Sequence, residues 1–446
     1  MTPNAITTRY LEEVVQRGGS GTELVELAHR SFDLAITSYG GHCLTRPVFL
    51  DHSEFTELTD DVSQLQAALT DLPRRLFGGD LAAFARAVGM TETQVTAILR
   101  GSSDAPTRLC RTDLYSDGTG FRAMEVNTGT AIGGLDNALL NRAWLAEPFV
   151  ADFVAAHRLS HADTMGGLVD TLRTECGIGA GAKPLIAAAD WPASFTTLEP
   201  RLRYSAVQLA SYGLDVIPCH VGQLVVRDGR VWLDGRPVDV IYRIFMIEDL
   251  LDPDGPALID PVLRAAERGE VTIFAPMDAE LYGSKGALAL LSDESSRDLY
   301  SADELASLDR ILPWTRMVRP GAVTADGEQV DLSEYAIARR EELILKPTLL
   351  HGGTGVVPGW LAGPDEWGHQ LKAAMDGPYV LQRRIRPVPE LFPADGGPEP
   401  WVLTWGAFLG SPGYIGAYVR GSADPGGGVV NMATGATATC CFHQEE

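Results

Sequence analysis

The sequence predicts a mixed α/β (α+β) fold. Three observations lead to this prediction. Apolar residues recur at helical spacing over much of the first hundred residues, a strand, a helix and a second strand follow one another between residues 185 and 220, and two further segments have the pattern of a β-hairpin. Because both periodicities occur along one chain, we expect helices packed against sheets.

Composition narrows the class of protein. The chain has 446 residues, enough for two or three domains. A hydrophobic content of 45% with 21% charged residues excludes wholesale disorder. The net charge of −23 argues against a general binder of nucleic acid or of acidic membranes, because both need a basic surface. A site for a polyanion such as ATP would therefore need its own cluster of lysine and arginine.

Cysteine usage and the N-terminus indicate a reduced, cytoplasmic protein without a membrane partner. The six cysteines form no CxxC pair, and the adjacent Cys440 and Cys441 are poor disulfide partners because neighbours in a strand point to opposite faces. No apolar run reaches the ~18 residues of a membrane-spanning helix. The first residues, MTPNAITTRYLEE, lack the pattern of a signal peptide.

The N-terminal region, residues 1–104, is expected to be helical and carries no chemical motif. Thr22–Tyr39 and Gly79–Val88 place apolar side chains at helical spacing, and Asn141–His157 predicts one long helix further along. We expect these helices to cover a core to which later parts of the chain contribute.

The segment RTDLYSDGTGFRAMEVNTGT, residues 111–130, is the most informative part of the chain. The turn Ser116–Gly120 separates two expected strands, Leu109–Tyr115 and Phe121–Val126, which predicts a β-hairpin. Alternate side chains share a face, so Arg111 and Asp113 lie together, as do Glu125 and Asn127.

The register of this hairpin decides whether the two polar faces become one. If Tyr115 pairs with Phe121, then Arg111 lies opposite Glu125; a slip of one residue would instead pair Asp113 with Arg122. Two carboxylates and an amide oxygen suit Mg²⁺, and an arginine beside them would stabilise negative charge on a phosphoryl or acyl oxygen. A solvated hairpin with cross-strand ion pairs explains the same residues about equally well.

Residues 177–280 are expected to form a small open α/β domain. Gly177–Pro184 is a flexible break, and the pattern after it predicts a strand over Leu185–Ala189, a helix over Leu198–Tyr212 and a strand over Asp215–His220. The glycines of the break precede the first strand, so they are a poor dinucleotide fingerprint. A hairpin and one more strand are expected to follow, over Leu224–Leu233 and Val238–Tyr242.

Two lysines lie beside features that suit phosphate. Lys346 ends an apolar strand, LILKP, that runs into the loop Gly352-Gly353-Thr354-Gly355, where small residues would let backbone N–H groups approach phosphate oxygens. The loop lacks the Walker pattern, and a tight turn explains its glycines equally well. Lys285 precedes an expected helix, Gly286–Leu291, and helix N-termini favour anions. A surface lysine is the simpler interpretation of Lys285.

Two C-terminal strands carry further polar residues. Tyr379–Ile385, YVLQRRI, predicts a strand that would place Gln382 and Arg383 near a nucleotide base, or else an ordinary buried strand with a solvated tip. The alternation across Phe408–Val419 predicts a strand of the central sheet, with Arg420 at its end facing a substrate, a phosphate or solvent. Pro389–Pro400 is expected to be a surface loop.

Together these motifs resemble the ATP-grasp superfamily, in the circularly permuted arrangement of the glutathionylspermidine synthetase-like enzymes. In ordinary members, such as relatives of D-alanine–D-alanine ligase, the two ATP-binding lysines precede the acidic residues, whereas here Lys285 and Lys346 follow them. The resemblance covers residues 105–440 in pieces: RTD, EVNT, VDVIYR, GSKGALALL, ILKPTLLHGGTGV, YVLQRRI and GAYVR. It implies antiparallel sheets flanking a nucleotide cleft, built from residues 105–176 and 281–446.

The resemblance also implies ATP and Mg²⁺ as cofactors and a role for each motif. Asp113, Glu125 and Asn127 would hold Mg²⁺, and Arg111 would stabilise the acyl-phosphate and tetrahedral transition states. The ATP contacts would come from Lys285, Lys346, a mobile lid formed by Gly352, Gly353, Thr354 and Gly355, and an adenine strand with Gln382, Arg383 and Ile385.

The expected function is that of an ATP-dependent carboxylate–amine ligase, with small-molecule substrates such as amino acids or peptides and a place in specialised peptide biosynthesis. Arg243 and Glu248 are expected to orient the substrates; substrate identity is assigned to Thr128, Gly129 and Thr130, where the resemblance stops. No Cys/His arrangement supports an amidase domain, so glutathione and spermidine are not implied. A phosphotransferase and a non-catalytic nucleotide-binding module stay as alternatives, and the sequence indicates no oligomeric state.

Overall fold

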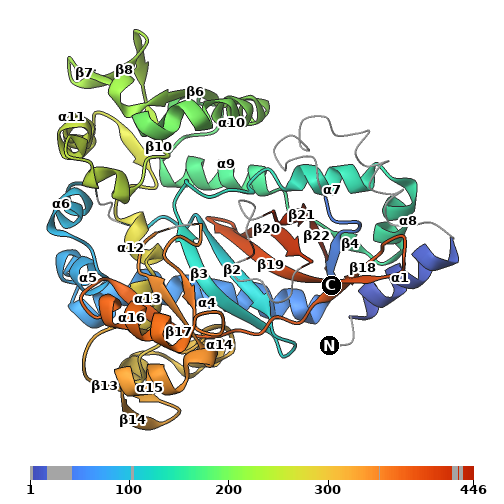
Figure 1. Ribbon diagram of the computed structural model, residues 1–446. Helices are drawn as coiled ribbons and strands as arrows, with labels where there is room; N and C mark the ends of the chain where they lie inside the picture. Colours follow the sequence, from blue (N-terminus) through green and yellow to red (C-terminus); the bar gives the residue numbers. More distant parts are fainter. Residues whose placement is uncertain are drawn as a thin grey trace.

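The computed structural model describes residues 4–17, 43–101, 105–350, 352–423, 430 and 435–445. The helix expected over Thr22–Tyr39 lies outside these residues. Figure 1 shows a central antiparallel sheet. A parallel sheet and its helices lie above the central sheet in this view, and a smaller sheet with short helices lies at the lower left.

The central sheet joins strands that are far apart in the sequence. Its order is β21-β20-β19-β2-β3, with β18 paired to β19 off this path, and every pair is antiparallel. Because β19 pairs with both β2 and β20, the predicted hairpin and the C-terminal strands form one surface (Figure 1). The strands are β2 (Cys110–Ser116), β3 (Phe121–Thr128), β18 (Glu390–Phe392), β19 (Glu399–Gly410), β20 (Gly413–Ser422) and β21 (Thr437–Thr439).

The predicted hairpin forms, but both registers considered for it are wrong. Asp113 pairs with Glu125, and Arg111 pairs with Asn127. The register shifts between Asp113 and Leu114, where a bulge adds one residue to β3. A bulge changes the pairing without disturbing the alternation on either side of it, so the sequence pattern did not reveal it. The four polar side chains still share one face.

Two predictions for the C-terminal strands are wrong. The single strand expected over Phe408–Val419 is a hairpin, because β19 ends at Gly410 and β20 begins at Gly413. Gly413 has φ +103°, a conformation that glycine adopts without steric cost, and the chain reverses there. The segment Pro389–Pro400, expected to be a loop throughout, contains β18, which pairs with the start of β19.

The strand–helix–strand order expected between residues 185 and 220 is confirmed. The four strands of this sheet, in the order β11-β10-β5-β6, are parallel, and all six residues of β5 are buried. The expected hairpin is also present, with its turn at Asp228 and Gly229. The elements are β5 (Leu185–Asp190), α10 (Pro192–Ser211), β6 (Asp215–His220), β7 (Val225–Arg227), β8 (Arg230–Leu233), β9 (Arg236–Val238), β10 (Val240–Arg243), the 3₁₀ helix η2 (Ile247–Leu251), α11 (Gly255–Glu267) and β11 (Thr272–Phe274).

A third sheet and the helices beside it contain Lys346, on β15, and Lys285, at the start of α13. Its order is β12-β17-β15-β16, and a cluster of buried apolar side chains fills the space between it and its helices. The expected helix after Ser284 is α13. The elements of this region are α12 (Ala279–Gly283), α13 (Lys285–Leu291), α14 (Ala302–Ile311), β12 (Thr315–Met317), β13 (Ala322–Ala325), β14 (Glu328–Asp331), α15 (Leu332–Ala338), β15 (Leu343–Pro347), β16 (Val357–Pro358), α16 (Pro364–Ala374) and β17 (Tyr379–Arg383).

The N-terminal residues pack against the rest of the chain. The helix α4 is 26 residues long and begins with a capping box between Asp51 and Glu54. The short strand β1 pairs in parallel with β22, so the N-terminal region and the last strand of the chain meet in one small sheet with β4. The elements are α1 (Ala5–Gln16), β1 (Val48–Leu50), α4 (His52–Phe77), α5 (Leu81–Ala87), α6 (Glu92–Arg100), β4 (Leu159–Ser160), α9 (Thr164–Glu175) and β22 (Cys441–Gln444).

The long helix expected over Asn141–His157 is two helices, α7 (Ala138–Leu145) and α8 (Pro148–Ala156). Pro148 occupies the first position of α8, where its missing N–H costs nothing, but it would remove a hydrogen bond from a continuous helix. Within the described ranges, no helix combines the length and apolar composition that crossing a bilayer requires.

Candidate active site

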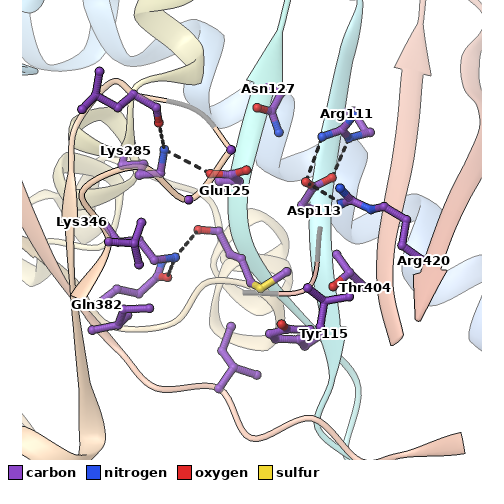
Figure 2. A pocket seen from close by; sticks show the side chains of 18 of the residues that line it. Arg111, Asp113, Tyr115, Glu125, Asn127, Lys285, Lys346, Gln382, Thr404 and Arg420 are labelled. Atoms are coloured by element: carbon purple, nitrogen blue, oxygen red, sulfur yellow. Dashed lines mark hydrogen bonds and ion pairs between the residues drawn. The ribbon is translucent and has the colours of Figure 1, made fainter. Parts of the chain in front are cut away.

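A cavity of about 340 Å³ lies where the central sheet faces the third sheet, and we call it the nucleotide cavity. β2, β3 and β20 supply one wall, and α13, β15 and β17 supply the other (Figure 2). The structure brings together here most of the residues that the sequence singled out: Arg111, Asp113, Glu125, Asn127, Lys285, Lys346, Gly352, Gly353, Gln382, Arg383, Ile385 and Arg420. Thr354 and Gly355 are absent from the lining.

Asp113 is held between two guanidinium groups (Figure 2). Arg111 donates to both carboxylate oxygens, at 2.6 and 2.9 Å, and Arg420 donates to Oδ2 at 2.9 Å. Burial lowers the pKa of Arg111, but the charge of Asp113 outweighs this effect and raises it, so the guanidinium stays charged. The carboxylate thereby orients two cations toward the cavity, as such bidentate pairs do.

Glu125 faces the lysines of the opposite wall. Its Oε2 lies 3.1 Å from Lys285 Nζ, which also donates to the carbonyl oxygens of Leu349 and Leu350, each at 3.2 Å (Figure 2). Burial alone would raise the pKa of Glu125. The charges of Lys285 and Lys346 have the larger, opposite effect and hold the pKa well below its usual value. Glu125 is therefore ionised, and Lys285 connects it to the start of the glycine loop.

Lys346 is a buried cation that forms no ion pair within the described part of the chain. Its Nζ donates to Gln382 Oε1 at 2.7 Å and to the carbonyl of Met124 at 3.2 Å. Burial lowers its pKa to about 8, although Glu125 opposes this shift. An anion bound beside Lys346 would supply the missing counter-charge.

The charge of the nucleotide cavity is opposite to that of the whole chain. Two carboxylates line it together with six basic side chains, whereas the chain as a whole carries a net charge of −23. Both carboxylates already contact cations, so the surplus is positive. This is the local basic cluster that a polyanion such as ATP needs. The basic residues are Arg111, Lys285, Lys346, Arg383, Arg384 and Arg420.

Oxygen donors for a hard cation are present on the β2–β3 face. Asp113 and Glu125 occupy directly opposed positions, which places their Cβ atoms ~5 Å apart in an antiparallel pair. Oδ1 of Asp113 accepts one hydrogen bond and keeps a lone pair. The buried side-chain amide nitrogen of Asn127 has no partner among the described residues, and a rotated amide would present its oxygen instead.

This donor set fits Mg²⁺ bound together with phosphate. No group of three or more His, Cys, Asp or Glu side chains that could hold a metal occurs in the described ranges. Mg²⁺ seldom uses an all-protein cage and commonly takes one or two carboxylates plus phosphates and water. Asp113, Glu125 and Asn127 fit that mode of binding.

The expected adenine strand, β17, lies inside the third sheet and not at its edge. Gln382 lies in β17, which pairs with β12 on one side and β15 on the other, so the ladders occupy this part of the main chain. Gln382 lines the nucleotide cavity, and its side-chain oxygen accepts a hydrogen bond from Lys346. The strand ends at Arg383, and the chain beyond it, including Ile385 and Pro387, lines the cavity outside the sheet.

The residues expected to bind substrate do not line the nucleotide cavity. Arg243 is buried and donates to Glu280 at 2.5 Å and to the carbonyls of Ala275 and Phe245. Together with Thr128 it lines a separate cavity of about 30 Å³. Glu248 lies on η2 and is absent from the lining of the nucleotide cavity.

The three residues after Asn127 connect this Arg243 network to β3. Thr128 donates to the carbonyl of Ala279, and Thr130 donates to the carbonyl of Arg243. Gly129 has φ +95°, and a Cβ there would lie 3.3 Å from Arg243 Nη2. Both hydroxyl groups thus donate to the main chain, and Thr130 alone of the three lines the second cavity described next.

A second cavity, of about 310 Å³, adjoins the nucleotide cavity, and we call it the adjoining cavity. The sequence reasoning missed its four charged residues, Asp136, Asp190, Arg201 and Asp249. Asp190 ends the parallel strand β5, and ligands of open α/β sheets bind at the carboxyl ends of strands, so this signal was available. Arg201 lies on a helix with no pattern to distinguish it, and Asp249 lies beside Glu248, which was singled out instead.

Comparison with known proteins identifies the fold. No family model matches this chain, and no curated protein matches it. A glutathione synthetase-like effector from Globodera pallida, solved in its apo form, superposes with a TM-score of 0.58 at 14% identity, covering 99% of this chain and 100% of that one. D-alanyl-alanine synthetase A from Vibrio cholerae gives a TM-score of 0.27 at 11% identity over 50% of this chain and 67% of that one, which is too low to carry an argument. The predicted fold class, a mixed α/β ATP-grasp fold with several antiparallel sheets, is confirmed by the first likeness.

Proposed function

We propose that the protein is an ATP-dependent carboxylate–amine ligase that forms an amide or peptide bond through an acyl phosphate. The observation that carries this proposal is the nucleotide cavity, where six basic side chains surround two opposed carboxylates in an otherwise acidic chain. The fold, which is that of a glutathione synthetase-like protein, supports it. ATP and Mg²⁺ are the proposed co-substrate and metal.

The proposed reaction has two steps. A substrate carboxylate oxygen bonds to the γ-phosphorus of ATP, the bond from that phosphorus to the β-phosphate oxygen breaks, and ADP leaves with the electron pair. The amine nitrogen then bonds to the acyl carbon, the bond from this carbon to the phosphate oxygen breaks, and the amine releases a proton. Neither step needs a covalent enzyme nucleophile.

The chain's own residues would act by placing charge. Lys285 and Lys346 would neutralise phosphate oxygens, and Arg111 and Arg420, oriented by Asp113, would stabilise the oxygen charge that develops in each transition state. Asp113, Glu125 and Asn127 would hold Mg²⁺, which when bound neutralises phosphate charge and fixes its orientation. The loop that contains Gly352 and Gly353 would close over the phosphates and exclude water.

We further propose that the ATP-grasp fold is circularly permuted in this chain. The hairpin with Asp113 and Glu125 precedes Lys285 and Lys346 in the sequence. The central sheet nevertheless joins that hairpin to β19 and β20, which follow the lysines, and this pairing supports the permuted arrangement. The chain order of the functional parts is thus changed while their spatial relation is kept.

Amino acids or small peptides are the proposed substrates, and specialised peptide or antibiotic biosynthesis in the cytoplasm is the proposed setting. The test is to incubate the protein with ATP, Mg²⁺ and a mixture of amino acids and dipeptides, and to follow products by mass spectrometry. We expect new amide masses that appear only together with ADP and that disappear when Mg²⁺ is omitted. A phosphorylated product without any amide would overturn the ligase in favour of a phosphotransferase, and no ATP consumption would favour a binding module.

A further inference from the structure

The nucleotide cavity and the adjoining cavity meet at the loop of residues 131–133 and at Met246. Ala131, Ile132, Gly133 and Met246 line both cavities. On one side of this loop the carbonyl of Gly133 accepts a 2.9 Å hydrogen bond from Arg111. On the other side a Cβ at Gly133 would lie 3.3 Å from a guanidinium nitrogen of Arg201. A molecule in the adjoining cavity would therefore lie next to the proposed site of phosphoryl transfer.

Asp190 and Asp249, two of the three carboxylates that line the adjoining cavity, have no cationic partner within the described residues. Asp190 has an exposed fraction of 2% and accepts a 3.0 Å hydrogen bond from Ser194. Asp249 accepts a 2.7 Å hydrogen bond from the backbone N–H of Met246. Neither hydrogen bond provides a counter-charge, which is costly for the buried Asp190 and less so for the half-buried Asp249.

The charges of these two groups act on each other. Burial raises the pKa of Asp190, and burial together with Asp190, Glu248 and Glu280 raises the pKa of Asp249 to about 6. Like charges that share a cavity resist ionising together. A cationic group bound between Asp190 and Asp249 would relieve both the burial cost and the repulsion, so this end of the cavity is suited to an ammonium.

A free cation occupies another part of the lining. Arg201, on α10, makes no hydrogen bond or ion pair within the part of the chain that the structure describes, whereas Arg203 on the same helix pairs with Glu199 at 2.5 Å. A guanidinium presents several donors in a plane, which matches a carboxylate. The rest of the lining contains the third carboxylate, Asp136, and is otherwise mainly apolar, with Met165, Leu168, Leu198, Leu202, Leu209 and Tyr242.

We propose that the adjoining cavity binds the amine substrate as a zwitterion with an apolar side chain, either a free α-amino acid or a dipeptide. Asp190 and Asp249 bind its ammonium group, Arg201 binds its carboxylate, and the apolar residues contact its side chain. The role of this molecule as acceptor rests on the proposed function, but its binding does not. The substrate is therefore selected by residues outside the motifs that hold the nucleotide.

Binding by the full-length protein tests the proposal without requiring turnover. Isothermal titration calorimetry is carried out with L-leucine, L-phenylalanine, L-leucylglycine and L-phenylalanylglycine, with and without a non-hydrolysable ATP analogue and Mg²⁺. We expect at least one of the four to bind, and the better of the amino-acid and dipeptide pairs identifies the source of the zwitterion. L-Leucinamide, which lacks the carboxylate, and 4-methylpentanoic acid, which lacks the ammonium, are expected to bind at least 10-fold more weakly.

Matched variants assign the charges. Asp190→Asn is expected to weaken binding of the zwitterion at least 10-fold, and so is Arg201→Met. Arg201→Met should leave the affinity for L-leucinamide unchanged, because that probe has no carboxylate. The controls Arg203→Met, on the same helix, and Asp215→Asn, on the neighbouring strand, should bind like the wild type. All four variants should keep wild-type affinity for the ATP analogue.

The outcomes separate this inference from the proposed function. If none of the four probes binds, or if Asp190→Asn and Arg201→Met bind them like the wild type, the inference is wrong even when amide products form with ATP. Tighter binding of L-lysine than of the apolar probes would also overturn the inference, because the cavity would then select a cationic side chain instead of an apolar one. Charge-dependent binding without any amide product would support the cavity assignment and overturn the ligase.

Discussion

Lys285 contacts both Glu125 and the main chain at the start of the glycine loop. Its Nζ lies 3.1 Å from Glu125 Oε2 and 3.2 Å from the carbonyl oxygens of Leu349 and Leu350. The same ammonium group therefore links the proposed metal site to the segment proposed to cover the phosphates. A phosphate entering the cavity would compete with those carbonyls for Lys285, and this competition would couple the proposed nucleotide binding to the position of the loop.

Glu125→Gln should abolish most of the turnover while the protein stays folded. The substitution keeps the shape of the side chain but removes the charge between Lys285 and Lys346. We expect the rate of ADP release to fall ~100-fold or more, the size of effect seen when one electrostatic contact to a transition state is lost. Glu342→Gln, whose side chain is exposed and pairs with Arg339, is the control. Turnover within a few-fold of wild type, with an unchanged thermal midpoint, would remove Glu125 from the site.

Lys346 should give nucleotide binding a characteristic pH dependence. Its pKa of about 8 lies below the ordinary value of 10.5 because of burial, so its charge is lost as the pH rises through about 8. The affinity for ADP should therefore fall between pH 7 and 9 in the wild type, and this part of the pH dependence should be absent in Lys346→Met. Lys372→Met, at an exposed position of α16, should behave like the wild type.

The same lysine has a predictable effect on folding. Between about pH 8 and 10.5 the unfolded chain binds more protons at this residue than the folded chain does, so the free energy of unfolding gains a component that rises with pH. Urea denaturation of Lys346→Met across this range should show that the component is lost. A pH profile identical to that of the wild type would contradict the assigned pKa.

Asp113→Asn should destabilise the fold because it leaves two buried guanidinium groups without a counter-charge. Removing one partner of a buried ion pair costs ~3–5 kcal/mol, and Asp113 has an exposed fraction of 3%. Asp117→Asn, which breaks the more exposed pair with Arg122, should cost about 1 kcal/mol or less. Adding Arg420→Met to Asp113→Asn should cost less than the sum of the single changes, since the two residues are in contact. Equal losses in urea denaturation for Asp113→Asn and Asp117→Asn would refute this account.

Gly406→Ala should lower activity through Arg111 without touching the cavity itself. Gly406 pairs with Asp113 across the sheet, and a Cβ there would lie 2.7 Å from Arg111 Cδ, so the arginine must move. A displacement of ~1 Å in a positioned catalytic group can cost ~100-fold in rate, and we expect a loss of that order in kcat. Gly368→Ala, on α16 with no atom within 4 Å of the added carbon, is the control and should keep full activity. Wild-type kcat for Gly406→Ala would show that Arg111 is not required in its present position.

Local sequence patterns were sufficient for much of the fold. Strand alternation placed Arg111 with Asp113 and Glu125 with Asn127, and the structure keeps each pair on the cavity face. The order of a strand, a helix and a second strand after residue 184 was also readable, because periodicity and turn residues are properties of neighbouring positions. Pro148 was a local signal for the break between α7 and α8, but the apolar residues on both sides of it favoured one continuous helix.

By itself, the sequence determined which polar residues lie on one face of each strand, and so most members of the nucleotide cavity. The tertiary structure decided which of them are partners: the bulge after Asp113 pairs it with Glu125, and Arg420 reaches Asp113 from a position 307 residues away. It also decided that Asp190 and Arg201 line one cavity. The physical reason is that alternation depends only on the local backbone, whereas register and ion pairing depend on how separate sheets and helices pack.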